Sequence, residues 1–208
     1  HTDYGNAAVG SAESPLSAAA SGICAEDGDN TIDNLGVIYA EAKAVATARG
    51  ESDTVTTSNR STANTLAAAS AAGISAGDGA DTVLNEIGAS ITAKATTELS
   101  ATADPDENGY INAPGALAAS AAGGITLGDG TKSVTNRGSI RAIAESTSQT
   151  HVHAESDAWD TDTYIVAQLS ATAHGIATGL GDSTLVNSGG IEATAAATSS
   201  AYSYSDSV

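Results

Sequence analysis

One short phrase, opened by a glycine and an isoleucine, recurs four times along the 208-residue chain at a constant spacing. The copies begin GICAEDGDN, GISAGDGAD, GITLGDGTK and GIATGLGDS. Their isoleucines, at 23, 74, 125 and 176, stand 51 residues apart (74 − 23, 125 − 74 and 176 − 125). Self-similarity at a fixed period of this size predicts a stacked repeat architecture, in which each unit buries its apolar face against its neighbours.

The repeat extends close to both ends of the sequence. The 22 residues before Ile23 and the 32 after Ile176 (208 − 176) together come close to one further period. We therefore expect four units cut from, or ready to join, a longer array. They form one domain, with units at residues 16–65, 66–116, 117–168 and 169–208, and with residues 1–15 as a partial unit able to complete a neighbouring copy.

The longest regular pattern is an alternation over eleven residues, from Ile38 to Ala48. Alanine occupies every second position from Ala40 onward, and residues such as Tyr39 and Glu41 lie between. A helix would turn alternate alanines to different faces, so the pattern predicts a strand. Its counterparts in the other units begin at Ile91, Ile140 and Ile191.

A shorter apolar stretch precedes each Gly-Ile. It starts at a leucine in every unit: Leu16, Leu66, Leu117 and Leu169. In the second unit we expect alternate residues of a strand to share one face, namely Leu66, Ala68, Ser70, Ala72 and Ile74. A later glycine in each unit is expected at a corner with positive φ, where alanine would be strained. These glycines are Gly36, Gly88, Gly138 and Gly189.

The composition limits the width of the interior. There is no Phe and no Met, and only one Trp, yet hydrophobic residues make up 41% of the chain. Small side chains cannot fill a wide globular core, but they suit a narrow interior between closely spaced backbones. Alanine-rich helices are the rival interpretation, and the period of two favours strands. The predicted fold is all-β, a parallel β-helix or β-solenoid of four repeats, with one or two coils in each.

Single residues also recur with the period. An asparagine stands at 34, 85, 136 and 187, spaced by 51. Identical asparagines in successive coils can form a hydrogen-bonded ladder along the stack; the alternative is that each caps its own turn. Cys24, the single cysteine, lies beside a repeat isoleucine and is expected to be a small buried residue rather than a reactive thiol.

The charge excludes one class of partner. Twenty-five acidic and seven basic residues give a net charge of −18, so nucleic-acid binding is not expected. Acidic residues in this number either solvate a surface or supply oxygen ligands to hard cations. No apolar run is long enough to span a bilayer. The basic residues are scattered and no nucleophile–base pair is evident, so we expect no enzymatic activity.

The turn after each repeat isoleucine is rich in Gly and Asp. Here the sequence resembles the Gly-Asp nonapeptides of calcium-binding RTX-type β-rolls. It also resembles the long repeats of autotransporter passengers and other bacterial or archaeal surface adhesins. The resemblance implies a secreted solenoid with calcium at its turns, held by Asp27, Asp29, Asp78, Asp81, Asp129 and Asp182. The phrase comes once per 51 residues rather than every nine, however, and Lys132 and Leu180 stand in ligand-like places. Ordinary Asp/Gly turn chemistry is the alternative.

A second candidate calcium site lies in the insertion at residues 104–112. Asp104, Asp106 and Asn108 stand at positions 1, 3 and 5 of an EF-hand-type loop, a glycine at 6, and the carbonyl of Tyr110 at 7. Gly115 replaces the bidentate glutamate at position 12, so a further carboxylate would have to complete the shell. Asp160 and Asp162 form a similar pair of carboxylates in the next insertion. The alternative is an acidic surface loop.

The insertions differ between units and carry most of the aromatic residues. Trp159, Tyr110 and Tyr164 are candidates for stacking on sugars, and Asn59 begins an acceptor triplet for N-glycosylation. His151 and His153 would share one strand face, where an exposed polar face is favoured over a metal pair.

Three classes of function follow. The first is a structural extracellular protein that stacks head-to-tail on copies of itself into a surface fibre, stiffened by calcium. The alternative is an adhesin that binds carbohydrate or neighbouring cells through its insertions. The third class, a polysaccharide-cleaving β-helix, is not expected.

Overall fold

The computed structural model describes residues 15–52, 59–61, 65–105, 109–155 and 163–206. Within these ranges the chain forms β-strands in parallel sheets, and no helix. We refer to the four ranges 15–52, 65–105, 109–155 and 163–206 as coils 1 to 4. Residues at equivalent positions in successive coils form what we term a column.

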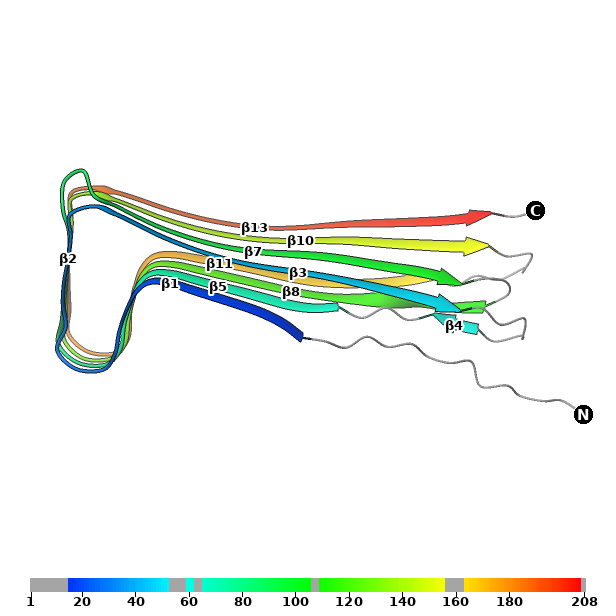
Figure 1. Cartoon of the computed structure of the whole chain (residues 1–208), viewed down its shortest axis with the longest axis horizontal. Helices are drawn as coiled ribbons and strands as arrows, with labels where there is room; N and C mark the ends of the chain where they lie inside the picture. The colour runs from blue at the N-terminus through cyan, green and yellow to red at the C-terminus, as the bar shows by residue number, and fades with distance from the viewer. Residues whose placement is uncertain (1–14, 53–58, 62–64, 106–108, 156–162, 207–208) are drawn as a thin grey trace, which may run out of the picture.

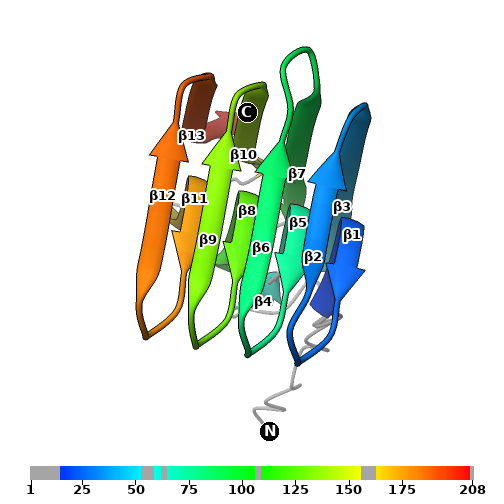
Figure 2. The same ribbon diagram turned by 90° about the vertical axis from the view of Figure 1, so that its left-hand side faces the viewer.

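Three sheets make up the structure, and each takes one long or short strand from every coil (Figures 1 and 2). The first sheet contains β1 (Pro15–Ala25), β5 (Thr65–Ala76), β8 (Gly109–Leu127) and β11 (Thr163–Thr178), with the short β4 (Asn59–Ser61) beside β8. The second contains β2 (Thr31–Asn34), β6 (Asp81–Asn85), β9 (Lys132–Asn136) and β12 (Ser183–Asn187). The third contains β3 (Val37–Ser52), β7 (Ser90–Pro105), β10 (Ser139–Glu155) and β13 (Gly190–Asp206).

Each 51-residue repeat forms one complete coil. Ile23 pairs with Ile74, Ile74 with Ile125, and Ile125 with Ile176, all in parallel register. The first and third sheets face each other, and the second closes them at one end as a short wall (Figure 1). The structure thus confirms a parallel β-solenoid and settles the number of coils in each repeat at one.

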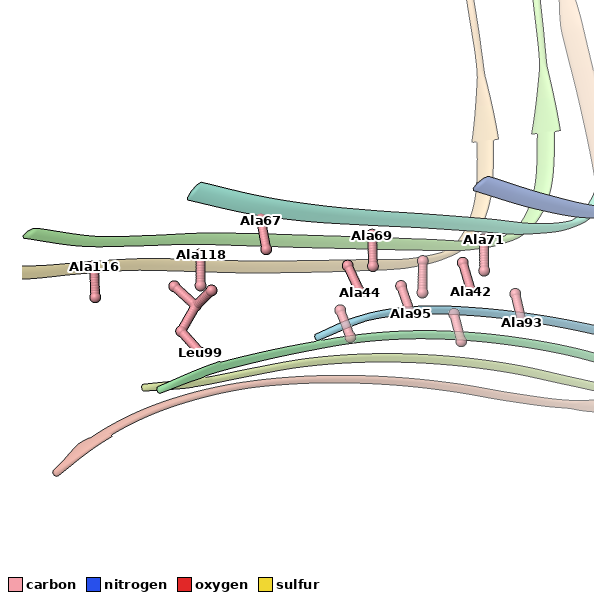
Figure 3. Packing of buried hydrophobic residues seen from close by; sticks show 13 residues of the cluster. Ala42, Ala44, Ala67, Ala69, Ala71, Ala93, Ala95, Leu99, Ala116 and Ala118 are labelled. Atoms are coloured by element: carbon pink, nitrogen blue, oxygen red, sulfur yellow. The ribbon is translucent and has the colours of Figure 1, made fainter. Parts of the chain in front are cut away.

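The core between the two long sheets consists almost entirely of alanine. Figure 3 shows these side chains meeting across the gap, with Leu99 the largest among them. A second cluster, next to the wall, is built from isoleucine and valine: Ile74, Ile91, Ile125, Ile140, Val83 and Val134 are each at most 2% exposed. The small side chains explain why the sandwich is thin along most of its length and wider only at the wall.

One strand face predicted from the alternation is wrong. Ala67, Ala69 and Ala71 point into the core, whereas Leu66 is 39% exposed. Ile74 is nevertheless fully buried, because the alternation shifts by one residue at Gly73, where the strand bends toward the wall. Leu66, Ala68, Ser70 and Ala72 therefore share one face, the outer one, and Ile74 does not belong to it.

The shift occurs at a column of glycines, Gly22, Gly73, Gly124 and Gly175, which the facing isoleucines cover. A Cβ on Gly124 would collide with Cγ2 of Ile140 and would lie 2.5 Å from the carbonyl oxygen of Gly175. The repeated Gly-Ile pair therefore lets the strand bend while the isoleucine of the opposite sheet packs against bare backbone.

Two further predictions need correction. Of the glycines expected at positive φ, only Gly88 has it; the others with positive φ lie in the Gly-Asp turns, at Gly28, Gly79, Gly130 and Gly181. Gly36, Gly138 and Gly189 follow the asparagines without adopting it. Cys24 is exposed rather than buried, because its neighbour Ile23 takes the inward position and strand side chains alternate.

Substituting a glycine of the bend should destabilise the fold selectively. Gly124→Ala should lower the free energy of unfolding by about 1–3 kcal/mol, the usual cost of forcing an extra methyl group into a packed interior. Gly36→Ala is the matched control, since its Cβ would meet nothing within 4 Å; its effect should stay within about 0.5 kcal/mol. Urea denaturation followed by circular dichroism measures both, and equal losses would contradict this role for Gly124.

Candidate functional site

The Gly-Asp turns lie above one another where each first-sheet strand leads into the wall (Figures 1 and 2). In three successive steps a turn carboxylate accepts a hydrogen bond from the backbone of the next coil. Asp27 Oδ1 accepts from Asp78 N (3.0 Å), Asp78 Oδ1 from Asp129 N (2.8 Å), and Asp129 Oδ1 from Leu180 N (2.7 Å). These predicted metal ligands join coil to coil.

The remaining turn aspartates differ in their partners. Asp29 Oδ1 accepts from Ala80 N (2.9 Å), two columns further along the turn. Asp182, in the same column of coil 4, has an exposed side chain, and its backbone oxygen accepts from Lys132 N (2.9 Å). Across the part of the chain that the structure describes, no group of three or more His, Cys, Asp or Glu side chains is arranged to hold a metal ion.

Lys132 is the most unusual residue of the turns, since its side chain is 1% exposed. Its Nζ donates to the carbonyl oxygens of Gly77 and Gly79, both at 3.0 Å, and to the carboxylate of Asp81, which is also fully buried. Two carbonyls and a carboxylate are ligands that a hard cation would use. In coil 2 the ammonium group of the next coil occupies that position.

In coil 1 the side-chain amide of Asn30 makes hydrogen bonds similar to those of the Lys132 ammonium group. Its Nδ2 donates to the carbonyl oxygens of Glu26 and Gly28 and to Asp81 Oδ1, each at 2.9 Å. Burial alone would raise the pKa of the Asp81 carboxyl. Hydrogen bonds from Lys132 and Asn30, together with the Lys132 charge, outweigh burial and hold the pKa of Asp81 below its ordinary value.

The Asn30–Asp81–Lys132 column therefore fixes the order of the coils. A buried charge without its partner is strongly unfavourable, so coil 3 can follow coil 2 only with Lys132 above Asp81. Sequence reasoning treated Asp81 as a metal ligand and Lys132 as a departure from the motif. The overlooked signal was their spacing of 51 residues (132 − 81), which puts opposite charges in one column.

The asparagines form the predicted ladder. Asn34 Nδ2 donates to Asn85 Oδ1 (2.8 Å), Asn85 to Asn136 (2.7 Å), and Asn136 to Asn187 (2.7 Å). Asn85 and Asn136 are fully buried, while Asn187, at the end of the stack, is exposed. Its Nδ2 donates to Gly189 O at 3.3 Å. The ladder runs in one direction, with each amide donating toward the next coil.

A polar seam that sequence reasoning missed links the two long sheets inside the alanine core. The hydroxyls of Thr97 and Ser120 lie 2.8 Å apart across the sandwich, and those of Ser146 and Ser120 lie 3.1 Å apart. Ser120 and Ser146 also donate to backbone carbonyls of the opposite sheet, at 2.7 and 2.6 Å. The flanking coils carry alanine at these positions, so the hydroxyl contacts lie in the inner coils, and Ser146 extends the seam to the backbone of Ser170 in coil 4.

The coil 4 end leaves core residues uncovered. Leu185 is 54% exposed and Ile191 41%, whereas Val134 and Ile140, directly beneath them, are 1% and 2% exposed. Backbone edges of β11, β12 and β13 lie at this end, and those of β1, β2 and β3 at the other. Edges of this kind are ready to pair with another chain.

Most of the other predicted site residues lie outside the described residues or are described by their backbone alone. Asp106, Asn108, Trp159, Asp160 and Asp162 fall outside the described residues. For Asp104, Tyr110, Tyr164 and Asn59 the structure gives the backbone alone, on β7, β8, β11 and β4. Calcium binding and glycosylation at these positions stay predictions.

His151 does lie on an exposed strand face, as expected. Its ring stacks on that of Tyr202 in the adjacent strand, with centroids 5.1 Å apart and an interplanar angle of 14°. His153 follows two residues later on the same strand, β10.

Comparison with protein-family models, with curated proteins and with solved structures finds no match to this chain. Among the described residues, none belongs to a helix of the length and apolar character needed to cross a bilayer. The proposed function therefore rests on the coil contacts and the two open ends.

The buried ion pair should show strong coupling in a double-mutant cycle. Lys132→Met alone leaves the Asp81 charge buried without its cation and should cost about 3–5 kcal/mol of unfolding free energy. Combining it with Asp81→Asn should cost less than the sum of the single changes, with a coupling of about 1–3 kcal/mol. Chemical denaturation of the four variants measures this.

The exposed pair of Arg141 and Glu192, 3.3 Å apart, is the control for that cycle. Its coupling should be close to zero because water screens both groups. If the effects at Lys132 and Asp81 are additive, like those of the exposed pair, this column does not determine the order of the coils.

Proposed function

We propose that this chain is a structural subunit or segment of an extracellular fibre, in which copies stack head-to-tail through their terminal coils. The observation that carries the proposal is the match between coil 1 and coil 4. One offset relates them throughout: 176 − 23, 187 − 34 and 191 − 38 all equal 153, or three periods of 51. No insertion interrupts this correspondence between residues 15–52 and 168–205.

Of the two inner coils, coil 3 keeps these spacings and coil 2 does not. Coil 2 carries extra residues around Gly88, and its loop protrudes at the corner between the wall and the third sheet (Figure 1). Coils 1 and 4 have the same lengths between their glycine bend, their turn, their asparagine and their long strand. A second copy could therefore add its coil 1 to coil 4 with the register already used between coils.

The exposed apolar residues supply the driving force. Leu185 and Ile191 lie in columns that are buried in the inner coils, where another coil lies on each side. Covering a half-exposed leucine or isoleucine contributes on the order of 1 kcal/mol each, and pairing the free strand edges adds hydrogen bonds along three sheets. The same surfaces left open in solution would favour aggregation.

The geometry of such stacking produces a fibre rather than a closed ring. The coils lie side by side as nearly parallel copies (Figure 2). Contact between two different surfaces of one molecule is heterologous, and without a closing rotation it continues indefinitely. Each added subunit would lengthen the fibre by four coils.

The extracellular location rests on the likeness of the Gly-Asp turns to those of secreted and surface repeat proteins. The net charge of −18 fits a fibre whose sides repel one another and stay separate in solution. Stiffening by calcium is part of the proposal only for the insertion at residues 104–112.

An adhesin is the second candidate, and one observation favours it. The strands that flank the insertions meet at the side of the solenoid opposite the wall (Figure 1). They are β3, β7 and β10, which end there, and β5, β8 and β11, which begin there. Loops gathered at one end in successive coils would give a stacked array a repeated binding surface. The two functions are compatible in one fibre.

Lysine at the open end should abolish assembly without unfolding the chain. Leu185→Lys places a charge where the next copy would bury it, so sedimentation and light scattering should show monomers at concentrations at which the wild type forms fibres. The melting temperature should change little, because Leu185 is already 54% exposed.

Val186→Lys is the matched control. Val186 is the next residue of β12 and is similarly exposed, at 53%, but its column faces outward, with Thr135 and Leu84. This variant should assemble like the wild type. A wild-type chain that stays monomeric at high concentration, or equal loss of assembly in both variants, would overturn the proposal.

A further inference from the structure

We infer that the partner of the coil 4 surface is coil 1 of a second copy in one fixed register and polarity, specified by Asn187 and Asp182. This inference rests on the proposed head-to-tail stacking and adds its register. At the offset of 153 residues, Asn187 stands beside Asn34 of the next copy and Asp182 beside Asp29.

The first determinant is the open asparagine ladder. Within the chain each Nδ2 donates to the Oδ1 of the asparagine in the following coil, at 2.7–2.8 Å. The Nδ2 of Asn187 can donate one further hydrogen bond of the ladder to a following coil. The Oδ1 of Asn34 accepts from Gly36 N at 3.1 Å within the chain. A carbonyl oxygen has two lone pairs, so Asn34 can accept from Asn187 and keep that bond.

The second determinant is a substitution in the turn. Leu180 replaces the carboxylate that accepts the next coil's backbone N–H in coils 1 to 3, so this bond cannot form at the junction. Asp182 restores it two residues later. Its column already uses the same bond once, from Ala80 N to Asp29 Oδ1 at 2.9 Å. In the stacked register Asp182 would accept from the backbone N–H of Asp29.

The pattern within this column supports a role at the junction. The first and last coils carry Asp29 and Asp182, while coils 2 and 3 carry Ala80 and Thr131. In the stacked register Leu180 stands beside Asp27 of the next copy. The stack of turn carboxylates formed by Asp27, Asp78 and Asp129 is therefore interrupted at Leu180 and begins again at Asp27 of that copy. The junction thus has a like-charge contact at Asp182 and Asp29 in place of one between positions 180 and 27, and its carboxylate can accept a backbone N–H as the turn carboxylates do within the chain.

The same contacts fix the polarity. The ladder and the turn carboxylates both run in one direction, from each coil to the next. Two coil 4 surfaces placed face to face would present the same end of the ladder and the same turn carboxylate on both sides, so the parallel in-register pairing could not continue. Only coil 4 against coil 1 pairs the donors of one surface with the acceptors of the other.

The exposed Cys24 allows the register to be measured by cross-linking. Its column contains Ser75, Thr126 and Ala177 in successive coils. In the inferred register Ala177 therefore stands next to Cys24 of the following copy, within the Cα separation of about 4.4–6.8 Å that a disulfide requires. Assembled Ala177→Cys protein, treated with a mild oxidant such as oxidised glutathione, should give a ladder of linked chains on a non-reducing gel.

Two variants control for geometry. Cys24→Ser with Thr126→Cys and Ala177→Cys should close an intramolecular disulfide, which establishes that this column can be bridged. Thr172→Cys with the native Cys24 should leave the chains unlinked, because position 172 lies five residues, or roughly 16 Å, along the strand from 177.

The outcomes separate the inference from the proposed function. Fibres of Ala177→Cys that stay unlinked, while the intramolecular control closes, would overturn the register and leave stacking intact. Linking at Thr172→Cys would do the same. Disulfide-linked dimers of the wild-type chain in assembled material would indicate contact between two coil 1 surfaces and overturn the polarity. A wild type that never assembles removes the proposed function, and the register with it.

Discussion

In-register pairing between parallel coils is the constraint on which the rest of the structure depends. Once Ile23, Ile74, Ile125 and Ile176 pair directly, every position is repeated in a column with spacing near 4.8 Å. Each residue must then be compatible with its counterparts above and below, as well as with its own surroundings. Alanine satisfies this in the narrow sandwich, glycine at the bend, and asparagine in the buried ladder, where one side chain is both donor and acceptor.

Charged columns meet the same constraint by alternating sign. Identical charges repeated at this spacing would repel, whereas Asp81 with Lys132, Glu86 with Arg137, and Arg141 with Glu192 each pair across one coil step. The register pairs Glu51–Asp104 and Glu155–Asp206 do not alternate in sign. The turn aspartates Asp27, Asp78 and Asp129 do not alternate either, and each of these three carboxylates accepts a backbone N–H of the next coil. Exposed pairs contribute little to stability, so the buried Asp81–Lys132 pair is the one that specifies which coil follows which.

The period and the two-residue alternation were sufficient to predict the solenoid, its parallel sheets and the asparagine ladder, because all three depend only on which residues recur. Predictions that depended on local backbone geometry failed. Placing Ile74 on the same strand face as Leu66 ignored the bend at Gly73, and positive φ belongs to the turn glycines rather than to Gly36, Gly138 and Gly189. The Lys132 contact was missed because the turn was viewed as one loop with its own ligands, whereas its partners come from two coils.

We propose that the contact between coils continues unchanged from one copy to the next. Fibre diffraction from aligned assemblies of the whole chain would measure this continuity. We expect a meridional reflection near 4.8 Å and an axial subunit repeat of about 19 Å, four coil spacings. A subunit repeat that is not four coil spacings, or a 4.8 Å reflection perpendicular to the fibre axis, would contradict it.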